Sequence, residues 1–181
     1  MTKRRIVSRD ELHGRIQELG RRLSRDYQGR QLVTVGVLNG AFIFLADLVR
    51  AISIPLEIDF IRVASYDDNS FSSGSIRLTK EVELDIDGKD ILLVEDIVDT
   101  GLTLAWLQEY FKSRPVGSVR TCALIDKPER REVDVPIDYV GFADKEGFLI
   151  GYGLDYAQQY RHLPEIFSIE DYTEEEKKGE K

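Results

Sequence analysis

The chain has 181 residues, of which 42% are hydrophobic, and this is enough for one folded domain with its own core. Its formal net charge of −8 argues against general nucleic-acid binding, which depends on cationic contacts to phosphates. No apolar run approaches the length of a membrane span, and no apolar signal-peptide core follows the basic first residues, so we expect no membrane contact. Cys122 is the only cysteine, which excludes an internal disulfide and fits a reducing cytoplasm. Two histidines and one cysteine argue against a structural zinc site, but they leave open hard cations held by Asp and Glu oxygens.

The first predicted element is an amphipathic helix near the start of the chain. Ser8 and Glu11 have the spacing of a capping box, which marks a helix N-terminus. The apolar residues that follow recur at helical spacing: Leu12, Ile16, Leu19 and Leu23. Gln28-Gly29-Arg30 ends the helix, and we expect its solvated face to carry four arginines: Arg15, Arg21, Arg22 and Arg25.

Strands and helices then alternate. Residues 32–38 form an apolar run typical of a buried strand, and residues 41–50 have the pattern of an amphipathic helix. Residues 56–63 predict a second strand. The segment 65–75 is polar and rich in serine, so we expect a mobile loop there. Residues 76–82 are expected to pair as an edge strand.

Residues 91–104 are the most informative segment. Four aliphatic residues predict a buried parallel strand, and they run directly into Glu95 and Asp96. Open α/β sheets place their ligands at the carboxyl ends of strands. Asp99 and residues 100–103 follow where a loop turns into the next helix, whose free amides and dipole favour an anion. Carboxylates beside such an anion site suit a sugar phosphate.

The rest of the chain completes a parallel α/β sheet. We expect a helix over 102–112, a strand over 118–125 and short extended segments at 139–142 and 148–151. Because strands alternate with helices in the middle, the sheet core is expected over roughly 30–126, with a smaller lobe built from the two chain ends. The highly charged tail, 173–181, is expected to be solvated and disordered. No internal repeat is visible, so the prediction is one domain over 1–181.

The 94–103 segment resembles the phosphoribosyl-pyrophosphate signature of type I phosphoribosyltransferases, and other segments narrow the resemblance to the hypoxanthine-guanine family. The match runs in order from about residue 33 to 169. It rests on these segments: Val94-Glu95-Asp96-Ile97-Val98-Asp99-Thr100-Gly101-Leu102-Thr103, Val37-Leu38-Asn39-Gly40-Ala41-Phe42 with Ala46-Asp47-Leu48, Ser65-Tyr66, Asp126-Lys127-Pro128, and Phe148-Leu149-Ile150-Gly151-Tyr152-Gly153-Leu154-Asp155-Tyr156 with Arg161.

This resemblance implies a fold and a reaction. The fold is the α/β type I phosphoribosyltransferase fold, a twisted parallel sheet flanked by helices with a small hood built from the chain ends. The reaction is purine salvage, in which the 5-phosphoribosyl group of phosphoribosyl pyrophosphate moves to N9 of hypoxanthine or guanine with Mg²⁺, giving IMP or GMP and pyrophosphate. The family also implies a homodimer or homotetramer. Two alternatives stay open: a xanthine- or guanine-preferring enzyme, and a nucleotide-sensing regulatory protein on the same fold.

The family's phosphate and metal positions fall on the 94–103 segment and on one acid near the C-terminus. Backbone amides and hydroxyls of Asp99, Thr100, Gly101, Leu102 and Thr103 are expected to bind the 5′-phosphate. Glu95 and Asp96 are expected to bind the ribose hydroxyls, directly or through Mg²⁺, although two acids ending a strand can also be merely solvated. Asp155 matches the position of a second magnesium ligand.

The family's base-binding positions lie on three other segments. Asp99 matches the proposed general base near purine N7, and the alternative for it is a helix N-cap. Lys127 is expected to reach the purine O6 and so to reject 6-amino bases, although the plain alternative is a lysine on the protein surface. Phe148 is expected to stack on the purine, although spacing alone favours a core residue. Leu149 would offer backbone groups to the base edge.

The remaining family positions concern pyrophosphate and closure. The loop Leu38-Asn39-Gly40 is expected to bind pyrophosphate through backbone amides, and the family often has a cis peptide between its first two residues; an Asn-Gly turn is the plain alternative. Arg161 matches a pyrophosphate-binding position. Ser65 and Tyr66 are expected to begin a segment that closes over the reacting sugar.

The chain departs from the family pattern at three places. Asn39 stands where related chains often carry a basic residue, and Leu102 stands where Lys or Asn occurs. Lys145-Glu146-Gly147 replaces the usual Pro-Asp-x before the stacking aromatic. The last departure lies near the edge of the base that distinguishes hypoxanthine from guanine, so the preference between them stays open.

Overall fold

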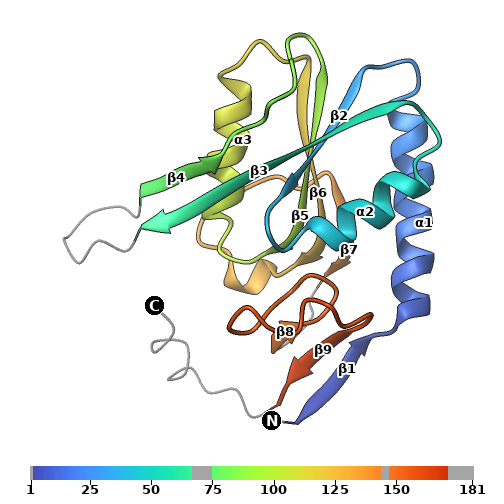
Figure 1. Cartoon of the computed structure of the whole chain (residues 1–181), viewed down its shortest axis with the longest axis vertical. Coiled ribbons are helices and arrows are strands. Elements are labelled where there is room, and N and C mark those ends of the chain that lie inside the picture. The colour runs from blue at the N-terminus through green and yellow to red at the C-terminus, as the bar shows by residue number, and fades with distance from the viewer. Residues whose placement is uncertain (1, 67–74, 144–146, 171–181) are drawn as a thin grey trace.

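The computed structural model describes residues 2–66, 75–143 and 147–170. Its larger sheet has six strands in the order β4-β3-β2-β5-β6-β7 (Figure 1). The strands are β2 (Leu32–Val37), β3 (Leu56–Tyr66), β4 (Ser75–Lys80), β5 (Asp90–Val98), β6 (Ser118–Asp126) and β7 (Tyr139–Ala143). All neighbours pair in parallel except β4, which is antiparallel to β3 at one edge. The predicted α/β fold with a parallel sheet is confirmed.

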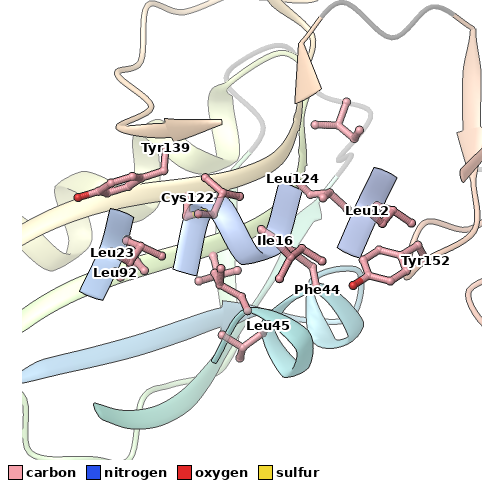
Figure 2. Close-up of a cluster of buried hydrophobic side chains, with 14 of the residues drawn as sticks. Leu12, Ile16, Leu23, Phe44, Leu45, Leu92, Cys122, Leu124, Tyr139 and Tyr152 are labelled. Atoms are coloured by element: carbon pink, nitrogen blue, oxygen red, sulfur yellow. The ribbon is translucent and has the colours of Figure 1, made fainter. Parts of the chain in front are cut away.

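Helices cover both faces of this sheet because successive apolar side chains of the central strands point to opposite faces. Leu92 and Val94 on β5 join the core under α1 (Arg9–Asp26) and α2 (Phe42–Ala51), part of which Figure 2 shows. Ile91 and Leu93 point to the other face and pack with α3 (Leu102–Lys112). A strand that is apolar on both faces is what a sheet between two helical layers requires.

Helix α1 begins and packs as its sequence predicts. Ser8 forms the capping box with Glu11, and all four of the spaced apolar residues are buried. The expectation for its arginines is wrong in part. Arg15 donates from Nε to the Gly141 carbonyl at 2.6 Å, and the Arg22 guanidinium lies 4.6 Å from the centre of the Tyr139 ring. Arg15 is half-buried and attaches the helix to β7, whereas 53% of the Arg22 side chain is still exposed, so only Arg15 departs from the predicted solvated face.

A second sheet is built from both chain ends. It contains β1 (Lys3–Val7), β9 (Ile166–Ile169) and β8 (Phe148–Ile150) in the antiparallel order β1-β9-β8. Figure 1 shows it beside the carboxyl ends of β5 and β6, joined to the large sheet by α1. This sheet is the predicted hood. The short helix η1 (Pro128–Arg130) follows β6.

Two strands run further than their apolar runs suggested. β3 continues through Ser65 and Tyr66, which pair with Ile76 and Ser75 of β4, so these two residues belong to a strand and not to a loop. β5 continues to Val98, which pairs with Asp126. The predicted mobile segment over 67–74 and the predicted tail over 173–181 lie outside the described residues. In the described ranges, no helix has the length and apolar character needed to cross a bilayer.

Candidate active site

Two carboxylates lie together near the carboxyl end of β5. Glu95 is 7% exposed and Asp96 is half-buried, and the Asp96 carboxylate accepts a hydrogen bond from the Ile97 amide at 2.9 Å. Burial raises the pKa of Glu95 well above its usual range, and the neighbouring charge of Asp96 adds to this. Burial also raises the pKa of Asp96 to about 6, against the opposing attraction of Arg161. The pair is therefore costly to ionise until hydroxyls or a cation compensate it.

This donor set fits Mg²⁺ that is held jointly with a substrate. Magnesium in proteins is bound by one or two carboxylates, with waters and substrate phosphates completing its shell. Glu95 and Asp96 are two such carboxylates on one strand. Within the described ranges, no three His, Cys, Asp or Glu side chains gather into a metal-binding group of their own. Buried carboxylates with raised pKa values are also typical of functional sites.

Residues 131–133 donate hydrogen bonds to the backbone carbonyls of the loop after β5. The Asp99 carbonyl accepts from Arg131 Nε at 3.2 Å, and the Thr100 carbonyl accepts from the amides of Glu132 and Val133 at 2.9 and 3.3 Å. In a planar trans peptide the carbonyl and the following N–H point in opposite directions, so the amides of Thr100 and Gly101 face away from this support. A cavity of about 110 Å³ lies there, lined by Glu95, Ile97, Val98, Asp99, Thr100, Gly101, Thr103 and Leu104.

Helix α3 begins without a side-chain cap. Its N-cap residue is Gly101, at φ +84°, and the cap makes no side-chain hydrogen bond. A side chain at Gly101 would need a left-handed backbone and would press against Arg131 and Val135. The N-cap alternative for Asp99 is therefore wrong. The Leu102 amide donates to Thr100 Oγ1 at a long 3.4 Å, and the N-terminus of the helix remains suited to an anion.

The predicted pyrophosphate loop lies against the carboxylates. The Leu38–Asn39 peptide is cis, as the family resemblance implied. A Cβ atom at Gly40 would collide with the Asp96 carboxylate, and one at Gly153 would collide with the Gly40 carbonyl. A cavity of about 260 Å³ opens between these parts, lined by Val37, Leu38, Gly40, Val63, Ile76, Glu95, Asp96, Ile97 and Thr103. Asn39 itself is exposed.

Asp155 and Arg161 form an ion pair that closes a tight irregular segment. Arg161 Nη2 lies 2.8 Å from Asp155 Oδ1, and its Nη1 donates to the Gly153 carbonyl at 2.7 Å. Between them, three residues that are not glycine have positive φ: Ala157 (50°), Gln158 (62°) and Tyr160 (73°). Such backbone is uncommon and concentrates at functional sites. Both charges influence the Asp96 carboxyl, which places them beside the β5 acids.

Lys127 connects the end of β6 to the start of β8. It is 4% exposed, and its Nζ donates to the Gly147 carbonyl at 2.6 Å, next to Phe148. Its amide donates to the Val98 carbonyl at 3.0 Å, next to Asp99. The surface-lysine alternative is therefore wrong. Phe148 is half-buried and meets the Tyr156 ring edge-on, with centroids 5.7 Å apart.

The site brings most of the predicted residues to one rim. The Leu149 side chain is buried in the core, which leaves its backbone for a ligand, the part that the resemblance implied. Ser65 and Tyr66 lie on β3, and their side chains are outside the described part of the structure. Sequence reasoning missed Arg130 and Arg131. Pro128 was the available signal, since a turn after a strand end returns the next side chains toward that end.

A further cavity lies elsewhere on the described part of the chain. It has about 500 Å³ and is lined by Arg9, Leu12, His13, Ile16, Ile43, Asp47, Arg50, Tyr152, His162, Leu163 and Pro164. It lacks Glu95, Asp96, Asp99 and Lys127, so it offers neither the paired acids nor the anion loop. Tyr152 donates to Asp47 beside it, which ties the irregular segment to α2. The chemistry favours the smaller cavities at the end of β5.

Residues 8–157 match the family described as the phosphoribosyl transferase domain. The chain therefore belongs to the phosphoribosyltransferase family. Within that family its similarity is to the hypoxanthine and hypoxanthine-guanine members. It is 44% identical over 166 residues to the hypoxanthine phosphoribosyltransferase of Salmonella typhimurium, covering 91% of this chain and 93% of that protein. It is 43% identical over 161 residues to the hypoxanthine-guanine phosphoribosyltransferase of Bacillus subtilis, covering 89% of each.

Solved structures agree with this placement. A hypoxanthine-guanine phosphoribosyltransferase from Bacillus anthracis is 40% identical and superimposes with a TM-score of 0.87, covering 92% of this chain and 98% of that one. A hypoxanthine phosphoribosyltransferase from Staphylococcus aureus, also 40% identical, gives the same TM-score and covers 92% and 90%. The predicted family and fold are thus confirmed.

Proposed function

We propose that this chain is a purine-salvage enzyme that transfers the 5-phosphoribosyl group of phosphoribosyl pyrophosphate to N9 of hypoxanthine or guanine. The products are IMP or GMP and pyrophosphate. The proposal rests on one set of contacts beside the 99–103 loop. Asp99 pairs with Arg130, and the Arg130 amide donates to the Lys127 carbonyl. Lys127 Nζ in turn donates to the carbonyl of Gly147, which precedes Phe148. The xanthine-preferring and regulatory alternatives are not favoured, because the relatives above are named for hypoxanthine or for hypoxanthine and guanine.

Base recognition follows from the buried lysine. The Lys127 ammonium would donate to the O6 carbonyl of a 6-oxopurine. A 6-amino group would present donors to the same ammonium and leave it without an acceptor. Sites that hydrogen-bond one substrate group reject an analogue without it strongly, because the buried protein group is then unpaired. Phe148 would cover one face of the ring, and the Leu149 backbone would meet its edge.

The proton chemistry falls to Asp99. Attack by N9 on C1′ makes the purine cationic, and a proton must leave the ring as the new bond forms. The Asp99 side chain is 35% exposed just after β5, and its carboxylate would accept that proton from N7. In the reverse direction it returns the proton as the base departs.

Phosphate binding divides between two loops. The amides of the 99–103 loop and the hydroxyls of Thr100 and Thr103 would hold the 5′-phosphate, and the 38–40 loop and Arg161 would hold pyrophosphate. Glu95 and Asp96 would bind the ribose hydroxyls, and with Asp155 they would hold Mg²⁺. When bound, Mg²⁺ supplies positive charge to the pyrophosphate as its bond to C1′ breaks. Closure of the segment that follows Ser65 and Tyr66 would exclude water.

Asn39 departs from the family pattern, in which a basic residue is often found at this position. Without a cation at position 39, pyrophosphate affinity depends more on Mg²⁺ and on Arg161. The Arg161 guanidinium is already oriented by Asp155 and by the Gly153 carbonyl, so it is fixed before pyrophosphate arrives. We also propose a homodimer or homotetramer working in the cytoplasm, which sedimentation analysis of the purified chain would test for assembly.

A pyrophosphate-release assay tests the function. The purified chain is given phosphoribosyl pyrophosphate and Mg²⁺ with hypoxanthine, guanine, xanthine or adenine in separate reactions. The proposal expects release with hypoxanthine and guanine and little with adenine. Release that is independent of added purine, or none with any purine, would contradict it. The ratio between hypoxanthine and guanine settles the preference that the 145–147 departure leaves open.

A further inference from the structure

The two oxygens of the Asp99 carboxylate have different surroundings. Oδ1 is buried and, within the described part of the chain, has no hydrogen-bond partner of good geometry. Arg130 forms an ion pair with it, and the Arg130 Nε lies 3.1 Å away. The Asp99 side chain is nevertheless 35% exposed, so its exposed part lies away from Oδ1. One oxygen faces Arg130, and the other is left for a ligand.

The short helix η1 fixes the backbone of Arg130. The turn starts directly after Lys127, with Pro128 as its first residue. The Arg130 amide donates to the Lys127 carbonyl at 3.2 Å. The residue that would recognise the base and the residue beside Asp99 therefore belong to one turn.

The next residue anchors this turn to both neighbouring strands. The Arg131 guanidinium pairs with the Asp126 carboxylate at the end of β6 and donates to the Asp99 carbonyl at 3.2 Å. The Arg131 side chain is largely covered, at 16% exposed, whereas that of Arg130 is 41% exposed. Arg131 holds the backbone of the loop, and Arg130 is left to act on the Asp99 side chain.

We propose that Arg130 is a positioning residue for Asp99. By occupying Oδ1 it limits rotation of the carboxylate and presents Oδ2 to the purine N7. It acts through Asp99 and does not itself exchange a proton or touch the reacting atoms. An exposed ion pair contributes little to folding stability, so this contact is expected to matter for turnover more than for the fold. The inference rests on the proposed function.

A double-mutant cycle on the purified full chain tests this role, with the steady-state rate of IMP formation as the readout. We expect Arg130→Ala to lower kcat about 10-fold while KM for phosphoribosyl pyrophosphate changes less than about 2-fold, because only the orientation of the base is lost. Arg130→Lys should recover part of the loss. In an Asp99→Asn background the further loss from Arg130→Ala should be under about 2-fold, since its target is gone. Arg21→Ala, an exposed arginine on α1, is the matched control.

The outcomes distinguish a failure of the role proposed for Arg130 from a failure of the proposed function. If Arg130→Ala keeps full kcat, or loses the same factor in both backgrounds, Arg130 does not act through Asp99 and the inference falls while the proposed function stands. If Asp99→Asn alone keeps full kcat, the base assignment fails and the inference with it. A melting temperature of Arg130→Ala within about 2 °C of the unaltered chain shows that a lost kcat is not lost folding.

Discussion

Lys127 Nζ donates to the Gly147 carbonyl at 2.6 Å, and this contact joins the large sheet to the hood. Lys127 directly follows β6, whereas Gly147 directly precedes Phe148 on β8. Gly147 has φ +82°, and a Cβ atom there would collide with the Ser168 hydroxyl, so the carbonyl is aimed by a backbone that suits glycine. One ammonium thus holds the Phe148 segment and, in the proposed function, also faces the purine.

Lys127→Ala should erode the preference for 6-oxopurines. The variant loses the donor to O6 and the contact to Gly147, so we expect discrimination between hypoxanthine and adenine to fall about 100-fold or more. The measurement is kcat/KM for each base at saturating phosphoribosyl pyrophosphate. An unchanged ratio of the two values would remove Lys127 from base recognition.

Asp99→Asn should reduce turnover far more than nucleotide binding. Loss of the proton acceptor is expected to lower kcat by about 10²- to 10⁴-fold, the usual range for a general base. The amide keeps the size and shape of the carboxylate, so the dissociation constant of IMP should change much less. Calorimetric titration with IMP, beside the kinetic assay, compares the two effects. Equal turnover in the variant would end the base assignment.

Much of the fold follows from local patterns. Residues 102–112 were predicted as a helix from their spacing, and α3 has those bounds. The acids were predicted at the end of the 91–94 strand, but β5 continues to Val98 because β6 supplies pairing partners beyond the apolar run. Periodicity reports which residues are buried, and it does not report where a neighbouring strand continues the ladder.

The site, like the fold, was predictable in its local features and not in its long-range contacts. Adjacent acids and a loop before a helix are local features, and the sequence displays them directly. The contacts of Arg130 with Asp99 and of Lys127 with Gly147 join residues that are distant in sequence, and no local propensity encodes them. The family resemblance supplied the proposed roles of Lys127 and Phe148, but it gave none for Arg130.

Asp96→Asn should stabilise the ligand-free protein at neutral pH. The folded pKa of Asp96 is about 6, above its ordinary value of 3.8, so the folded state holds this proton more tightly than the unfolded state. Stability therefore falls as pH rises from about 4 to about 6 and stays reduced above. Removing the charge should raise the melting temperature by roughly 3 to 9 °C at pH 7.5, from about 1–3 kcal/mol. At pH 4 the two proteins should melt alike, and a variant that melts lower at pH 7.5 would contradict this reading.

The same carboxyl predicts a pH dependence of substrate binding. Mg²⁺ and phosphoribosyl pyrophosphate need ionised acids, so their affinity for the free enzyme should weaken as pH falls through about 6. The raised pKa of Glu95 should extend the weakening to higher pH. Isothermal titrations from pH 5 to 8 measure this, with Asp96→Asn as the comparison. Affinity that is flat across this range would mean that neither acid contacts the ligand.

Gly40→Ala should damage the pyrophosphate loop selectively. Its new methyl group would collide with the Asp96 carboxylate, so the loop must shift, and KM for phosphoribosyl pyrophosphate should rise by about 10-fold or more. Gly14→Ala is the control, because a Cβ atom there meets nothing within 4 Å. Since Gly14 lies inside α1, that variant should gain about 0.5–1 kcal/mol of stability with unchanged KM. Equal KM values for the two variants would argue against the placement of the 38–40 loop beside the carboxylates.

A crystal structure of this chain with IMP, pyrophosphate and Mg²⁺ tests the central claim most directly, because it locates the purine. The account predicts N7 within hydrogen-bonding distance of Asp99, O6 at Lys127 Nζ, the ring against Phe148 and the 5′-phosphate at the amides of residues 99–103. A nucleotide found instead in the larger cavity beside His13 and His162, away from the β5 acids, would contradict the account.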